Sequence, residues 1–154
     1  MNTVQITKHF EDVPGDTVRL EKLARTVCTR FGASRATVSI GIVDDAEIRE
    51  LNRRFLNHAR STDCLSFDLS EGQGRNGQRV FDLIVNGQMA VREATRRGHS
   101  GEAELALYIT HGLLHQLGFD DGTPEQAEEM HQTEDEILQH MGYGLVYNTD
   151  PKSR

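Results

Sequence analysis

Two histidines four residues apart, His111 and His115, open the stretch "HGLLHQLGFDD" and are well suited to bind one metal ion. Residues at this spacing share a face of an α-helix, so both imidazole rings can reach the same ion. Gly118 is expected to end the helix, because glycine most easily takes the left-handed backbone conformation. Asp121 can then return beneath the two rings. Two imidazoles, a carboxylate and an open fourth position are typical of a catalytic zinc site, and the carboxylate makes manganese or iron more acceptable.

Neighbouring residues leave alternatives open. Asp120 is a second candidate for the third ligand, or it orients a ligand histidine. His131 is a more distant candidate and is interpreted as a surface residue. A metal-free histidine pair in a core is also possible in principle, but burying two imidazoles without partners is costly. Gly112 stands where zinc proteases of the H-E-x-x-H type carry their general base, which predicts against peptide hydrolysis and lets another segment approach the helix.

The elements around the histidines indicate an α+β fold in a single domain spanning residues 1–154. Residues 102–118 are apolar on most sides, which predicts a central buried helix carrying the metal site. Further helices are predicted over residues 16–32, 44–57, 87–98 and 123–142, and strands over 36–43, 63–69 and 79–85. The last two strands are expected to form a hairpin whose tip, residues 70–78, is rich in Gly, Asn and Gln. The expected architecture is a small mixed β-sheet packed with about five helices.

Composition and charge limit the partners. The net charge is −7, so the chain as a whole is not an obvious nucleic-acid binder, and its arginine clusters are interpreted as solvated helix faces. No apolar run reaches membrane-spanning length, and the start "MNTVQITKHFEDV" lacks the layout of a secretory signal. Cys28 and Cys64 lie among apolar neighbours and are interpreted as reduced, buried residues. These features predict a cytoplasmic protein with no membrane partner.

Several stretches resemble the YbeY family of metal-dependent endoribonucleases that mature ribosomal RNA. "HGLLHQLGFDD" resembles the family's H-G-x-L-H-L-x-G-Y-D-H, "STDCLSF" its P-T-D-V-L-S-F, and "FDLIVNGQMA" its G-D-I-V-I-S segment. The resemblance covers about residue 35 to residue 144 in the expected order. It implies an α+β domain with a zinc-like site in a cleft, acting on single-stranded RNA in ribosomal RNA processing and ribosome quality control. The family's first two metal histidines carry over onto His111 and His115.

The chain departs from the family pattern at two positions. The family's third histidine falls on Asp121, an acceptable zinc ligand whose charge should make the bound water less acidic. An arginine usual in the family falls on Leu56, which cannot grip a phosphate. Arg60, or less favourably Arg53, is the expected substitute. Thr62, Asp63 and Ser66 are candidates to line the substrate cleft, with Thr62 and Ser66 as substrate-binding residues beside Arg60. Thr62 and Ser66 are equally plausible as strand residues that satisfy backbone groups.

Three functional hypotheses follow. The first is a single-strand-specific endoribonuclease that hydrolyses phosphodiesters with a metal-activated water, with ribosomal RNA or the ribosome as partner and no DNA. No side chain is an evident general base. The second is a ribosome-associated RNA-binding factor that keeps the metal fold but has little or no nuclease activity. The third is a structural metal site or a metal-free histidine pair, for which a melting temperature unchanged by chelator would be the sign.

Overall fold

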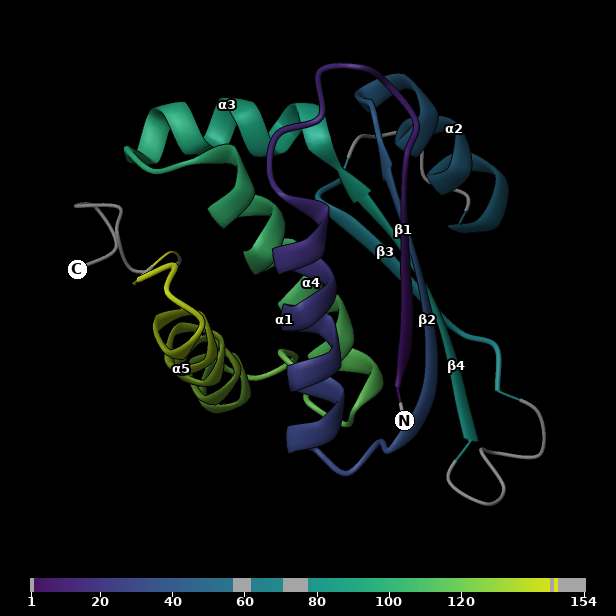
Figure 1. Cartoon of the computed structure of the whole chain (residues 1–154), viewed down its shortest axis with the longest axis vertical. Helices are drawn as coiled ribbons and strands as arrows, with labels where there is room; N and C mark the ends of the chain where they lie inside the picture. The colour runs from purple at the N-terminus through teal and green to yellow at the C-terminus, as the bar shows by residue number, and fades with distance from the viewer. Residues whose placement is uncertain (1, 57–61, 71–77, 145, 147–154) are drawn as a thin grey trace.

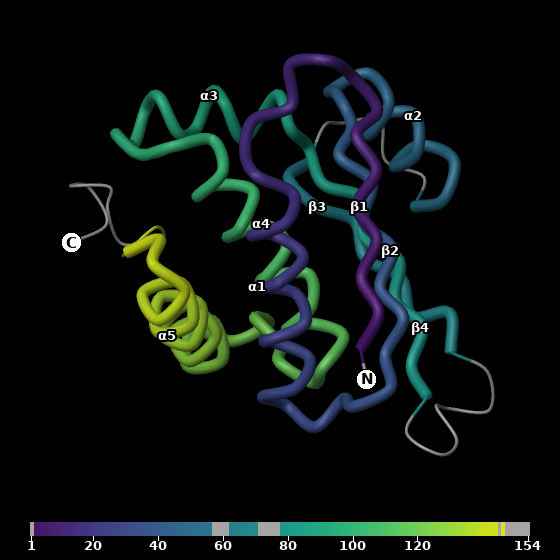
Figure 2. The backbone as a smooth tube through the Cα atoms, viewed as in Figure 1, coloured from purple at the N-terminus to yellow at the C-terminus, as the bar shows by residue number. Residues whose placement is uncertain are grey.

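The computed structural model describes residues 2–56, 62–70, 78–144 and 146, and within them five helices and four strands (Figures 1 and 2). In chain order the elements are β1 Thr3–Lys8, α1 Thr17–Arg30, β2 Arg35–Val43, α2 Asp45–Leu56, β3 Cys64–Asp68, β4 Gln78–Asn86, α3 Gly87–Arg97, α4 Gly101–Gln116 and α5 Pro124–His140.

The four strands form one mixed sheet in the order β1-β2-β4-β3. β1 and β4 both run parallel to β2, and β3 runs antiparallel to β4 with Cys64 opposite Val85. The expected α+β fold and the β3–β4 pairing are therefore confirmed, while most of the hairpin tip lies outside the described residues. β1 is an addition that the sequence did not indicate. Its place comes from pairing with β2, where Ile6 lies opposite Ile40.

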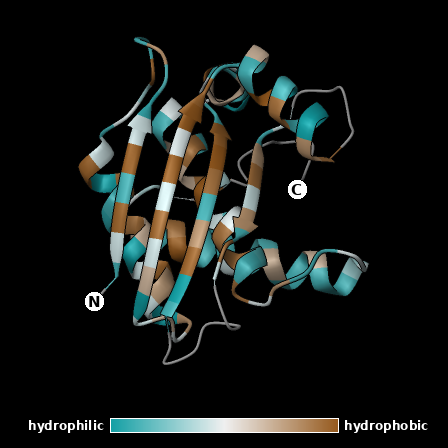
Figure 3. Cartoon of the chain, turned by 90° about the vertical axis from the view of Figure 1, so that its right-hand side faces the viewer, coloured by the Kyte–Doolittle hydropathy of each residue, from teal (hydrophilic) through white to brown (hydrophobic). Residues whose placement is uncertain are grey.

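Side chains alternate between the two faces of the sheet, as the pleat requires. On β4, Phe81, Leu83 and Val85 join the main core, which α1, α4 and α5 cover. Ile84 points to the other face and packs in a smaller cluster with Ile48 of α2. Figure 3 looks onto this second face, where the four strands lie in front of most of the helices.

α4 is the central helix of the larger layer, as its apolar sequence predicted. Eleven of its residues are buried, from Ala103 to Leu114. Ser100 caps its N-terminus by accepting a hydrogen bond from the backbone N–H of Ala103 at 3.1 Å, which satisfies one of the free donors of the first turn. Among the residues that the structure describes, no helix is long and apolar enough to span a membrane.

Candidate metal centre

Three potential ligand atoms converge at the C-terminal end of α4. The Nε2 atoms of His111 and His115 lie 3.1 Å apart. Asp121 Oδ2 lies 3.8 Å from His111 Nε2 and 3.5 Å from His115 Nε2. A tetrahedral zinc ion with bonds of 2.0–2.1 Å separates its ligands by about 3.3 Å. The three side chains therefore fit one such ion with little rearrangement, and they form the only group of this kind found among the described residues.

The local sequence explains why Asp121 reaches the histidines. Gly118 takes a φ of +107°, the left-handed conformation that turns the chain after α4. The backbone N–H of Phe119 then donates to the carbonyl of Leu114 at 2.9 Å, which holds the turn against the helix. Asp120 accepts hydrogen bonds from the backbone N–H groups of Asp121 and Gly122 at 2.8 and 3.2 Å. The Asp120 carboxylate thus shapes the turn, and it is Asp121 that faces the rings.

Glu134 of α5 supports the centre from behind. Its side chain is fully buried (0% exposed), and its two oxygens accept hydrogen bonds from His111 Nδ1 at 2.6 Å and His131 Nδ1 at 2.7 Å. Burial raises the pKa of Glu134, but the hydrogen bonds from both histidines outweigh it and hold that pKa below its ordinary value. With Nδ1 of His111 engaged as a donor, Nε2 is left to face the other two candidate ligands.

The Glu134 carboxylate also shifts the pKa of His111. Burial lowers the pKa of His111, but the hydrogen bond and charge of Glu134 outweigh it, and Asp63 and Asp121 add to the net rise. The interpretation of His131 as a surface residue was wrong. Its side chain is 23% exposed, shares Glu134 with His111 and stacks on the His111 ring with 6.3 Å between centroids. The acid three residues after His131 was the sequence signal for this pairing.

Gly112 allows α4 to lie directly against the sheet. A Cβ at this position would meet Cys64 Sγ at 2.8 Å and a Leu83 side-chain carbon at 3.2 Å. The expectation of a close approach at this glycine is confirmed. Cys64 acts here as a packing residue. Burial, and to a smaller extent the negative charge of Asp63, raise the pKa of its thiol, so the thiol stays protonated.

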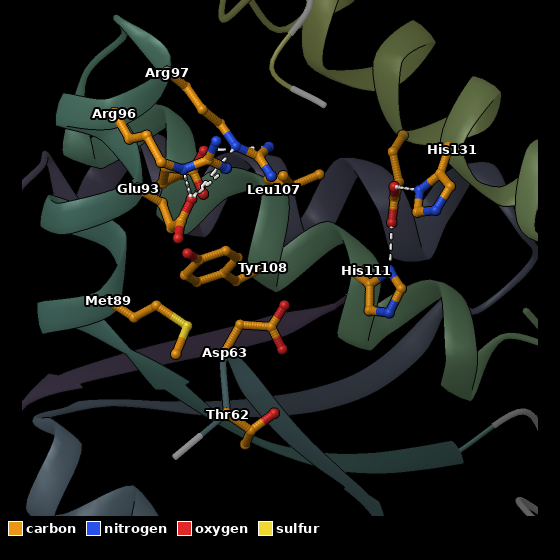
Figure 4. Close-up of a pocket in the computed structure, with 12 residues that line it drawn as sticks. Thr62, Asp63, Met89, Glu93, Arg96, Arg97, Leu107, Tyr108, His111 and His131 are labelled. Atoms are coloured by element: carbon orange, nitrogen blue, oxygen red, sulfur yellow. Dashed lines mark hydrogen bonds and ion pairs between the residues drawn. The ribbon is translucent and has the colours of Figure 1, made fainter. Parts of the chain in front are cut away.

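A pocket of about 430 Å³ opens beside His111 (Figure 4). Residues of the β3 entry, α3, α4 and α5 line it: Thr62, Asp63, Met89, Glu93, Arg96, Arg97, Glu104, Leu107, Tyr108, His111, His131 and Glu134. Asp63, which the sequence offered as a candidate for the lining of the substrate cleft, is among them, whereas Glu93, Glu104 and Tyr108 had not been singled out. The pocket joins one candidate metal ligand to two guanidinium groups and several carboxylates.

The candidate substrate residues are placed differently from one another. Thr62 lines the pocket. Ser66 lies on β3, where its hydroxyl accepts a hydrogen bond from Gln116 Nε2 at 3.0 Å and so ties β3 to α4. Arg60 lies outside the described residues. Arg53 is on an exposed face of α2 and pairs with Glu50 at 2.6 Å, and Leu56 is 47% exposed at the end of that helix.

Comparison with known proteins gives a consistent result. A family model described as endoribonuclease YbeY matches residues 5–142. The endoribonuclease YbeY of Thermobifida fusca is 35% identical over 82% of this chain and 86% of its own length. The same enzyme of Aquifex aeolicus is 33% identical over 82% of this chain and 85% of its own length. The solution structure of the Thermotoga maritima protein TM1509 superposes with a TM-score of 0.58 over the whole of both chains at 23% identity, a likeness of fold.

Proposed function

This chain belongs to the YbeY family of endoribonucleases, and we propose that residues 1–154 form one domain that hydrolyses single-stranded RNA with the help of a single metal ion. The observation that carries the proposal is the convergence of His111, His115 and Asp121 at ligand spacing, beside a pocket that His111 also lines. Relatives named as endoribonucleases supply the reaction class.

His111, His115 and Asp121 would hold the ion, with zinc the first choice and manganese or iron as alternatives. An ion there would acidify a water molecule and offset charge on a phosphoryl oxygen. Glu134 keeps the His111 ring oriented through Nδ1. The Asp121 carboxylate lowers the positive charge of the centre relative to three neutral imidazoles. We therefore expect a centre that tolerates harder ions than zinc.

The proposed substrate is a single-stranded segment of ribosomal RNA, cut during ribosomal RNA maturation and ribosome quality control in the cytoplasm. The pocket beside His111 is open to solvent and lined by Thr62. Arg60, two residues before Thr62, is proposed to grip a phosphate in place of the arginine that the family pattern has at Leu56. Arg53 is the less favoured substitute because it is already paired with Glu50.

The test is cleavage of an end-labelled, single-stranded ribosomal RNA fragment by purified protein of known metal content. Parent protein should cut it and should leave a matching duplex intact, and His115→Ala should reduce cleavage to background. His140→Ala is the matched control, because His140 lies exposed in the last turn of α5 and lines a different pocket. Cleavage that persists in His115→Ala would come from a contaminating nuclease and would refute the proposal.

The second candidate function is an RNA-binding factor of the ribosome that keeps the fold but cuts little or nothing. Two observations favour it: a carboxylate stands at the third ligand position, and Arg53, one candidate substitute for the arginine of the family pattern, is paired with Glu50 and does not line the pocket. The same assay separates the two functions. Tight binding of the single strand without products, at protein in excess over RNA and with a metal-loaded centre, would establish the binding factor.

A further inference from the structure

Asp63 is held rigidly by its backbone at the entry to β3. The backbone N–H of Asn86 donates to the Asp63 carbonyl at 2.9 Å, and the Asn86 side chain donates to the Thr62 carbonyl at 3.2 Å. Asn86 is itself fully buried. The main chain of residues 62 and 63 is thus fixed to the end of β4 and the start of α3, so the fold sets the direction in which the Asp63 side chain leaves the backbone.

The Asp63 carboxylate enters the pocket near Tyr108 and His111 (Figure 4). Tyr108 and His111 line the same pocket as Asp63. Within the described parts of the chain, no hydrogen bond or ion pair engages this carboxylate. The other carboxylates of the pocket are all engaged by cationic or histidine partners: Glu93 with Arg96 at 2.8 Å, Glu104 with His99 at 2.6 Å, and Glu134 with His111 and His131.

An open carboxylate beside the candidate centre matches a need of the proposed reaction. Hydrolysis of a phosphodiester requires that the attacking water lose a proton as its oxygen bonds to phosphorus. Gly112, beside the first histidine, has no side chain to accept it. The three carboxylates that already accept strong hydrogen bonds are poorly placed to take another proton. Asp63 is the remaining carboxylate among the described residues that line the pocket.

We propose that Asp63 is the catalytic proton acceptor, an assignment that rests on the proposed endoribonuclease function. The water oxygen forms a bond to phosphorus while one of its protons passes to a carboxylate oxygen of Asp63. The bond from phosphorus to the leaving ribose oxygen breaks with its electron pair. That oxygen takes up a proton from the Asp63 carboxyl, or it takes one from solvent while Asp63 releases its own proton to solvent. Either route returns Asp63 to its carboxylate form. No oxidant or further reactant is needed.

Charged and titratable groups from three helices face Asp63 across the pocket, and they set the conditions of the test. These are Glu93, Arg96 and Arg97 of α3, Glu104, Tyr108 and His111 of α4, and His131 and Glu134 of α5. Because several of them titrate, the discriminating readouts are the cleavage rate, the affinity for RNA and the metal content at one fixed pH. If Asp63 had a merely structural role, its substitution would not slow cleavage while leaving the RNA affinity and the metal content unchanged.

The experiment compares Asp63→Asn with parent protein on the same single-stranded RNA in single-turnover cleavage. Asparagine keeps the size of the side chain but is a poor proton acceptor, so we expect cleavage about 10²- to 10⁴-fold slower. Metal per chain should be unchanged. RNA affinity should be unchanged or slightly higher, because the substitution removes a negative charge from a site that would bind the polyanionic RNA. Asp63→Glu, which retains a carboxylate, should recover part of the rate. Asp82→Asn is the matched control. Asp82 precedes Leu83 on β4, so its side chain points to the other face of the sheet, and it does not line the pocket.

Three results would overturn the assignment. Cleavage by Asp63→Asn within threefold of parent would remove Asp63 from the reaction and leave the endoribonuclease function standing. Loss of metal or of RNA binding in both Asp63 variants would make the residue structural. Parent protein that binds metal and RNA without cutting would refute the endoribonuclease function itself, and the role of Asp63 with it.

Discussion

Glu134 is the residue whose substitution most directly tests the support of the centre. Both of its oxygens accept from imidazole Nδ1 atoms, whereas a glutamine offers one acceptor oxygen and one donor group. In Glu134→Gln one histidine must lose its partner, and we expect metal affinity to fall about 10- to 100-fold. Competition with a chromophoric chelator measures this. Glu136→Gln, which removes only an exposed ion pair with Arg30, should bind metal like parent; equal affinity in both variants would contradict the role given to Glu134.

Gly112 tests the packing that brings α4 against the sheet. Alanine favours a helix over glycine, yet its Cβ would lie 2.8 Å from Cys64 Sγ. We expect Gly112→Ala to lower the free energy of unfolding by about 1–3 kcal/mol through overpacking. The loss should be smaller in a Cys64→Ala background, since the sulfur is then gone, and a double-mutant cycle in urea measures the coupling. Additive effects of the two changes would show that the Cys64 contact is not what Gly112 relieves.

At the scale of elements, the start of α5 is set by a capping box directly after the turn that carries Asp121. Thr123 Oγ accepts from the N–H of Gln126 at 3.2 Å, and Gln126 Oε1 accepts from the N–H of Thr123 at 3.1 Å. We expect Thr123→Ala to cost about 1 kcal/mol of unfolding free energy. Thr133→Ala on the same helix removes a hydroxyl that donates to the Glu129 carbonyl one turn earlier, and should stay within about 0.5 kcal/mol. Equal losses in urea denaturation would mean that the box does not stabilise the helix.

The helices were predictable because their signals are local. Apolar spacing, N-caps at Asp16 and Asn86 and the stop at Gly98 all lie inside or beside the elements that they define. The same holds for the His111 and His115 pair. β1 was missed because Val4 is its only buried residue, and because its pairing with β2 spans more than 30 positions. Glu134 was missed because distant segments give it its neighbours, and Asp63 was singled out only as a candidate for the lining of the cleft because its position relative to His111 depends on the fold.

At the scale of the whole molecule, the candidate centre connects the two helices of the acidic C-terminal part. Two ligands lie on α4, the third lies on the turn toward α5, and Glu134 reaches back from α5 to His111. Together residues 101–154 carry eleven acidic and two basic side chains, so a cation here reduces repulsion where the charge is densest. Bound metal should therefore stabilise the native fold and not only the reaction.

The last prediction follows from that linkage. An ion at 100 times its Kd adds about 2.7 kcal/mol, which for a chain of this size raises Tm by roughly 5–10 °C. Differential scanning fluorimetry of parent protein should show this rise with zinc and its loss in chelator. Asp121→Ala should show a much smaller rise, because it keeps two ligands of three, while His140→Ala should behave like parent. A parent Tm that is the same in zinc and in chelator would identify His111 and His115 as a metal-free pair, with His111 held by Glu134, and the metal-dependent reaction would then have no centre.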